Sequence, residues 1–149
     1  MRLSLLSPRY WPTWAGMALM RLLALLPYPW LYRVGRALGS LVYRLPVRFV
    51  AIARRNLQLC LPELAGPERE KLLAQHFQSL GIGVGETAMA WYAADQTLRA
   101  LALIDGAQHV DAAQAGGKGV ILLASHFTTL EIGARFAAMR WPLNIVYRP

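Results

Sequence analysis

The stretch from Val120 to Glu131 reads VILLASHFTTLE and decides the fold class that we expect. Its first five residues, 120–124, form a short apolar run typical of a strand buried in a parallel sheet. The two threonines can cap a helix, and apolar residues then recur at helical spacing over 130–140. Residues 143–147 indicate a second strand. We therefore predict an α/β fold in which this β-α-β unit begins a larger sheet.

His126 and Glu131 lie at the carboxyl end of the first predicted strand, where ligands bind in open α/β sheets. The chain turns between them, so it can bring the Glu131 carboxylate to the His126 imidazole. The carboxylate would orient the ring, which would remove a proton from an attacking hydroxyl. A second interpretation stays open: His126 ends a strand, and Glu131 is a solvated residue stabilised by the helix dipole.

The basic residues are concentrated in the amino-terminal third of the chain. The 149 residues carry a net charge of +8, and nine arginines but no acidic residue lie in residues 1–55. These arginines adjoin an apolar segment and accompany no recognition motif, so we expect no nucleic-acid partner. A single cysteine, Cys60, forms no intrachain disulfide, and no His/Cys cluster with zinc spacing is present. We expect no metal and no cofactor.

Residues 10–32 are apolar except for Arg21, and as one helix they would be long enough to cross a membrane, although such a helix could also lie flat on it. Aromatic residues gather at both ends, as they do at the two interfaces of a bilayer. Arg21, Pro27 and Pro29 oppose this prediction. Arginines are more frequent after the segment than before it, so we expect a single-pass anchor with the remainder of the chain facing the cytoplasm.

Residues 34–56 are also helical in pattern, with an apolar stripe on one side and arginines on the other. Such a helix suits an anionic bilayer surface, although a solvated helix packed on the following domain fits as well. We divide the chain into a membrane anchor with a basic juxtamembrane helix, 1–56, and a cytoplasmic domain, 57–149.

The region from Glu68 to Trp91 predicts one or two amphipathic helices. Gly81, Gly83 and Gly85 interrupt it at alternate positions. No strand precedes them and the full phosphate-loop spacing is absent, so these glycines favour close helix packing over nucleotide binding.

Several segments together resemble the lipid A biosynthesis lauroyl and myristoyl acyltransferases. The resemblance rests on the His126–Glu131 segment with the Gly-Ala-Arg at 133–135, and on Tyr147-Arg148-Pro149. It extends to residues 30–33 (WLYR), 55–63 (RNLQLCLPE) and 85–91 (GETAMAW), so it covers most of the chain.

This resemblance implies an inner-membrane enzyme of lipopolysaccharide biosynthesis that takes a fatty acyl group from an acyl carrier protein thioester. The acceptor would be a hydroxyl of the lipid A precursor. His126 would be the general base, Glu131 its acidic partner, and Arg148 a substrate-binding residue that neutralises a phosphate or polarises the thioester carbonyl. Residues 57–149 would be the amino-terminal part of the acyltransferase domain. The family's enzymes are considerably longer, so we expect this polypeptide alone to be inactive or poorly folded.

Two alternatives remain. The same chemistry could serve another acceptor, such as a glycolipid or a lysophospholipid, because a histidine–carboxylate dyad determines the reaction and not the acceptor. The chain could also be a non-catalytic, basic membrane-binding protein in which His126 and Glu131 only support the fold.

Overall fold

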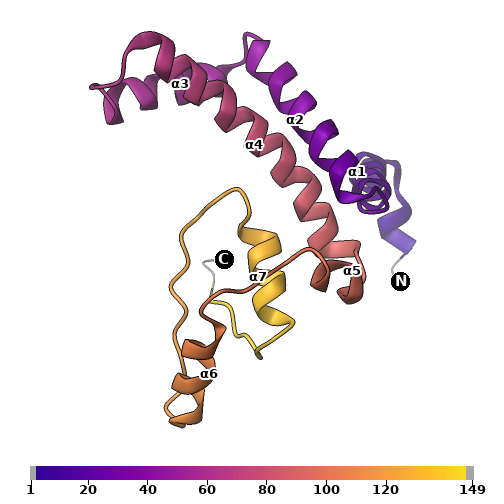
Figure 1. Ribbon diagram of the computed structural model, residues 1–149. Coiled ribbons are helices and arrows are strands. Elements are labelled where there is room, and N and C mark those ends of the chain that lie inside the picture. Colours follow the sequence, from indigo (N-terminus) through magenta and orange to yellow (C-terminus); the bar gives the residue numbers. More distant parts are fainter. Residues whose placement is uncertain (1–2, 147–149) are drawn as a thin grey trace.

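The computed structural model describes residues 3–146 and is built from helices (Figure 1). Two short 3₁₀-helices, η1 (Leu3–Leu6) and η2 (Pro8–Tyr10), precede α1 (Trp11–Leu23), α2 (Tyr28–Arg44), α3 (Arg48–Cys60), α4 (Gly66–Tyr92), α5 (Asp95–Arg99), α6 (Ala107–Ala115) and α7 (Leu130–Ala138). The long helix α4 is the axis of the molecule, and α2 lies along one side of it (Figure 1).

The prediction of an α/β fold is wrong for the part of the chain that the structure describes, because residues 3–146 contain no strand. Residues 119–127 and 142–146, where the two strands were expected, are irregular and flank helix α7. The side chains of Ile121 and Leu123 are 96% and 99% exposed. A strand requires a neighbouring strand to pair its backbone N–H and C=O groups, and within residues 3–146 these two segments find none.

The prediction of a single membrane helix over residues 10–32 is also wrong. Helix α1 ends at Leu23, and α2 begins at Tyr28 with Pro29 in its first turn. Proline is favoured in the first turn of a helix and disrupts a helix interior, so the two prolines here start a new helix instead of continuing the old one. Among the described residues, no helix is both sufficiently long and sufficiently apolar to cross a membrane.

A similar break occurs after α2, where one helix was predicted over residues 34–56. Pro46 lies between α2 and α3, and Leu45 before it has an extended backbone. A residue that precedes proline is disfavoured in the helical conformation. The chain therefore folds back, and α3 packs against the amino-terminal part of α4.

Glycines make the contact between α2 and α4 close. A Cβ atom added to Gly35 would lie 2.7 Å from the carbonyl oxygen of Gly81, and one added to Gly81 would collide with the backbone of Gly35. A Cβ on Gly83 would lie 2.9 Å from the carbonyl oxygen of Thr128. These glycines allow two neighbouring segments to touch the α4 backbone, in agreement with the packing role expected for them.

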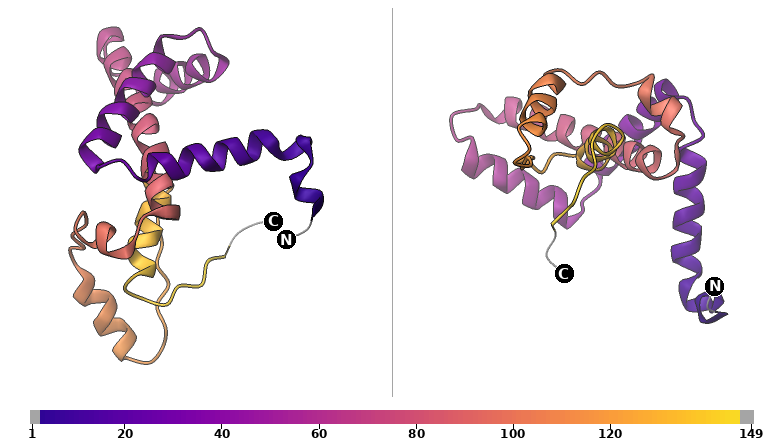
Figure 2. Two further views of the ribbon diagram at one scale, coloured as in Figure 1. Left: turned by 90° about the vertical axis from the view of Figure 1, so that its right-hand side faces the viewer. Right: turned by 90° about the horizontal axis from the view of Figure 1, so that it is seen from below.

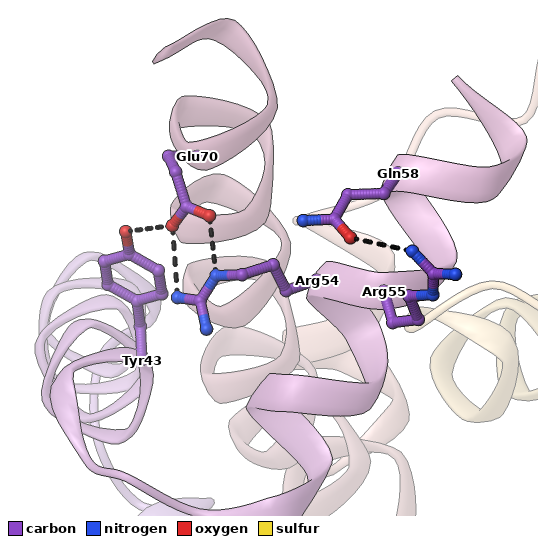
Figure 3. Close-up of polar contacts among 5 residues, drawn as sticks. All are labelled: Tyr43, Arg54, Arg55, Gln58 and Glu70. Carbon is purple, nitrogen blue, oxygen red and sulfur yellow. Dashed lines mark hydrogen bonds and ion pairs between the residues drawn. The ribbon is translucent and has the colours of Figure 1, made fainter. Parts of the chain in front are cut away.

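The carboxyl end of α2, the middle of α3 and the amino-terminal end of α4 meet in a polar clamp (Figure 3). Arg54 Nε of α3 donates to Glu70 Oε1 of α4 at 2.6 Å, and Arg54 Nη2 donates to Glu70 Oε2 at 3.1 Å. The Tyr43 hydroxyl of α2 donates to Glu70 Oε2 at 2.9 Å. The Arg54 guanidinium holds the pKa of Glu70 below its ordinary value, and the clamp ties three helices together over a core of Val50, Leu73 and Phe77.

Helix α1 has a different position from the other long helices. It crosses α4 near its own carboxyl end and projects away from the rest of the molecule (Figure 2). None of its side chains is buried.

Candidate active site

His126 lies at the end of the irregular segment 119–127, immediately before α7. The backbone N–H of Phe127 donates to the carbonyl of Ser125 at 3.0 Å, which closes a three-residue γ-turn around His126. A second turn follows, in which the N–H of Leu130 donates to the carbonyl of Phe127 at 3.1 Å. The turn leaves the imidazole exposed, where a hydroxyl group could approach it.

Glu131 occupies the first turn of α7, where the positive end of the helix dipole stabilises a carboxylate. Its side chain is exposed, and its Oε2 accepts a hydrogen bond of 3.4 Å from the indole Nε1 of Trp91 near the end of α4. The indole therefore holds the carboxylate on the side of α7 that faces α4.

Three contacts fix α7 against the helical body. Ile132 is buried in a second apolar cluster with Leu31, Met89, Ala90 and Leu98. Arg135 Nη2 pairs with Asp95 Oδ1 of α5 at 2.5 Å. Before the helix, the backbone of Thr128 lies directly on Gly83, as described above. The segment that carries His126 and Glu131 is thus positioned by α4 and α5.

A buried carboxylate, which the sequence reasoning did not single out, lies in the same region of α4. Glu86 is 8% exposed, and its Oε1 accepts a 2.9 Å hydrogen bond from the Tyr28 hydroxyl. Burial, together with the hydrogen bond and the negative charge of Glu86, raises the pKa of Tyr28 to about 12. The second oxygen, Oε2, is buried without a hydrogen-bond partner among the described residues. The hydrogen bond between Tyr28 and Glu86 links the start of α2 to the carboxyl-terminal half of α4.

Comparison with known proteins identifies the family. A family model described as "Bacterial lipid A biosynthesis acyltransferase" matches residues 1–149. The chain belongs to this family. It is 43% identical over 119 residues to the "Lipid A biosynthesis lauroyltransferase" of Escherichia coli (strain K12), an alignment that covers 80% of this chain and 39% of that protein.

Two further relatives have similar names. The chain is 39% identical over 144 residues to the "Lipid A biosynthesis palmitoleoyltransferase" of the same organism, which covers 97% of this chain and 47% of the relative. It is 40% identical over 114 residues to a "Lipid A biosynthesis acyltransferase" of Haemophilus influenzae, with 75% and 37% covered. The chain thus spans less than half the length of these relatives. No solved structure gives a significant match.

The predicted site residues of this lipid A acyltransferase family member are only partly brought together. His126 and Glu131 lie one turn apart along the chain, but among the described residues no hydrogen bond joins them. Arg148 lies outside the described residues, so its role stays a prediction. Within the described part of the chain, no three His, Cys, Asp or Glu side chains gather as metal ligands would.

The contacts made by Trp91 and Glu86 were not predicted. Both residues belong to the GETAMAW segment, residues 85–91, on which the family resemblance partly rests. That segment was the one sequence feature that could have drawn attention to them, because it contains a carboxylate and an indole in a helix otherwise rich in small apolar residues. Their partners, Tyr28 and Glu131, are 58 and 40 residues away in sequence, and spacing gives no information on such pairs.

Proposed function

We propose that this chain provides the general base of an acyltransferase that moves a fatty acyl group from an acyl carrier protein thioester to a hydroxyl of the lipid A precursor. The family match over residues 1–149 carries this proposal. The exposed positions of His126 and Glu131 support it, since a group that receives a proton from a substrate must be reachable.

The His126 imidazole would take the proton of the acceptor hydroxyl while the hydroxyl oxygen attacks the thioester carbonyl. A carbon–oxygen bond forms, the carbon–sulfur bond breaks, and the imidazolium returns the proton to the leaving thiolate. Glu131 would stabilise the imidazolium once the two side chains approach each other, because apo active sites often hold their catalytic hydrogen bonds loosely. Arg148 would bind a phosphate or the thioester carbonyl.

The proposed location is the surface of the bacterial inner membrane on its cytoplasmic side, where both substrates would be available. Nine arginines within residues 1–55, without an acidic residue, favour attachment to anionic lipid.

The test measures acyl transfer from acyl carrier protein to the lipid A precursor by a full-length family protein that contains this sequence. We expect His126→Ala to lower kcat by about 10²- to 10⁴-fold, the usual contribution of a general base. His109→Ala is the matched control, because His109 is exposed on α6 away from the site. Transfer at the unaltered rate by His126→Ala would refute the assignment.

Glu131→Gln separates the dyad from the alternative in which this carboxylate only stabilises the start of α7. If Glu131 is the partner of the imidazolium, the substitution should lower kcat and shift the pH profile of the reaction, since the imidazolium loses its counter-charge. If Glu131 only stabilises the helix, the substitution should lower the thermal stability and leave the pH profile unchanged.

A further inference from the structure

Helix α2 presents an apolar stripe that no other described element covers. Val34, Leu38 and Leu41 form it at helical spacing, and Leu45 directly follows the helix. All four are exposed, and Leu38 and Leu41 are more than half exposed. The glycines of α2 face α4 on the neighbouring side of the helix, so the stripe lies beside the helix contact and not within it.

Helix α4 continues this apolar surface. Leu80, Val84 and Trp91 lie at positions i, i+4 and i+11, which share one side of a helix, and each is exposed. The stripe runs between the side of α4 that contacts α2 and the side that contacts Thr128. It ends at Trp91, whose indole holds Glu131.

A groove lies between the two stripes. It encloses about 230 Å³ and is lined by apolar side chains and glycine backbone, including Leu38, Val42, Phe49, Phe77, Leu80 and Val84. No charged side chain lines it. Water in such a groove would have few hydrogen-bond partners, whereas a hydrocarbon chain would fill it favourably.

Arginines border this surface. Arg33 and Arg44 lie beside the α2 stripe, and Arg48 and Arg55 lie on the exposed side of α3. None of the four takes part in an ion pair with a described residue. Residues 1–62 contain no carboxylate side chain that could neutralise them. A negatively charged partner for these arginines must therefore come from outside α2 and α3.

We propose that the exposed face formed by α2, α4 and Phe49 of α3 is a docking surface for an anionic lipid bilayer, with one lipid hydrocarbon chain seated in the groove. The apolar stripes would enter the region below the headgroups, and the bordering arginines would meet the phosphates. A protein partner with an apolar face would satisfy the stripes but would leave the arginines unpaired unless it were also acidic. A bilayer satisfies both features at once.

This inference rests on the membrane location in the proposed function, and it deepens it by naming the surface. Because the α4 stripe ends at Trp91, docking in this orientation would bring Glu131 and the segment that carries His126 to the same lipid surface. A hydroxyl of a bilayer-embedded lipid could then reach the imidazole without leaving the membrane.

The experiment measures binding of a full-length family protein that contains this sequence to sedimenting vesicles of phosphatidylglycerol and of phosphatidylcholine. We expect stronger binding to the anionic vesicles and a loss of this preference as salt is added. Leu38→Gln and, independently, Val84→Gln should each weaken binding by about tenfold, since each removes an apolar side chain from the buried face. Arg33→Gln and Arg44→Gln should each weaken binding to anionic vesicles by about fivefold.

Matched controls lie outside the α2 and α4 stripes. Leu103 is 95% exposed in the connection between α5 and α6, and Lys118 is exposed after α6. Leu103→Gln and Lys118→Gln should bind as the unaltered chain does, and circular dichroism establishes that all variants keep their helices.

Two results would overturn the proposal. One is equal vesicle binding by Leu38→Gln, Val84→Gln and the controls. The other is self-association of the chain in light scattering that Leu38→Gln abolishes while vesicle binding persists, which would make the face a contact between two copies. His126→Ala should leave vesicle binding unchanged, so failure of the catalytic assignment and failure of the docking surface give different results.

Discussion

The helical body formed by α2, α3 and α4 and the irregular segments 119–127 and 142–146 bury their apolar side chains to very different extents. In the body, Leu31 and Leu73 are at most 2% exposed, whereas in the irregular segments Leu123 and Val146 are at least 98% exposed. The difference follows from backbone chemistry. A helix pairs its own N–H and C=O groups and needs only one neighbouring face, whereas an extended segment needs partners on both edges and both faces.

The largest difference in the free energy of unfolding is expected between alanine substitutions of two leucines, one from each region. Leu73→Ala should lower the free energy of unfolding by about 2–5 kcal/mol, because it opens a cavity between Val50 and Phe77. Leu123→Ala should change it by less than about 0.5 kcal/mol, since its side chain contacts mainly solvent. Urea unfolding followed by circular dichroism measures both. Equal losses in the two variants would show that the segment near His126 is packed, contrary to the structure.

The difference also explains which parts of the fold could be predicted. Periodicity correctly indicated helical structure in residues 34–56 and 68–91, because an amphipathic helix records its buried side in its own sequence. It did not locate the break at Pro46, and it joined residues 10–32 into one helix despite Pro27 and Pro29. Apolar runs at 120–124 and 143–147 predicted strands, but whether a run becomes a strand depends on a neighbour that the run itself does not encode.

The candidate site follows the same division. His126 and Glu131 were proposed because they are close in sequence and lie in a segment typical of the family, and their roles stay a prediction. The Trp91–Glu131 and Tyr28–Glu86 contacts were not found, because they join helices that only the tertiary packing brings together. Residues close in sequence could therefore be proposed as a site, whereas contacts between residues far apart in sequence could not be anticipated.

A smaller effect, opposite in sign for the two regions, is expected for glycine substitution. Gly35→Ala should cost about 1–3 kcal/mol, because its new methyl group would press on the backbone of Gly81 and Ile82 in α4. Gly133→Ala should instead stabilise α7 by about 0.5–1 kcal/mol, because nothing lies within 4 Å of the added atom and alanine favours a helix interior. Thermal unfolding of both variants tests this; stabilisation of Gly35→Ala would contradict the close contact of α2 with α4.

The smallest effect on stability is expected at the clamp of Glu70, Arg54 and Tyr43, which joins α4 to α3 and α2 (Figure 3). Glu70→Gln should cost less than about 1 kcal/mol at pH 7, since the Arg54 and Glu70 side chains are 40% and 42% exposed and water screens the pair. The pKa of Glu70 is lowered from its ordinary value of 4.5, first by the hydrogen bond from Arg54. A lowered pKa in the folded state means that the stabilisation is present above pH 4.5 and disappears as the pH falls through the folded-state value.

The pH dependence distinguishes the clamp from a general effect of removing charge. The free energies of unfolding of the unaltered chain and of Glu70→Gln should differ at pH 7 and converge on acidification, as measured by urea titrations at several pH values. Glu63→Gln removes a carboxylate of equal size from the exposed turn between α3 and α4 and should show no such convergence. A difference for Glu70→Gln that grew towards low pH would mean that folding makes the Glu70 carboxylate easier to protonate. That result would contradict the clamp, because an Arg54 guanidinium at 2.6 Å favours the charged carboxylate.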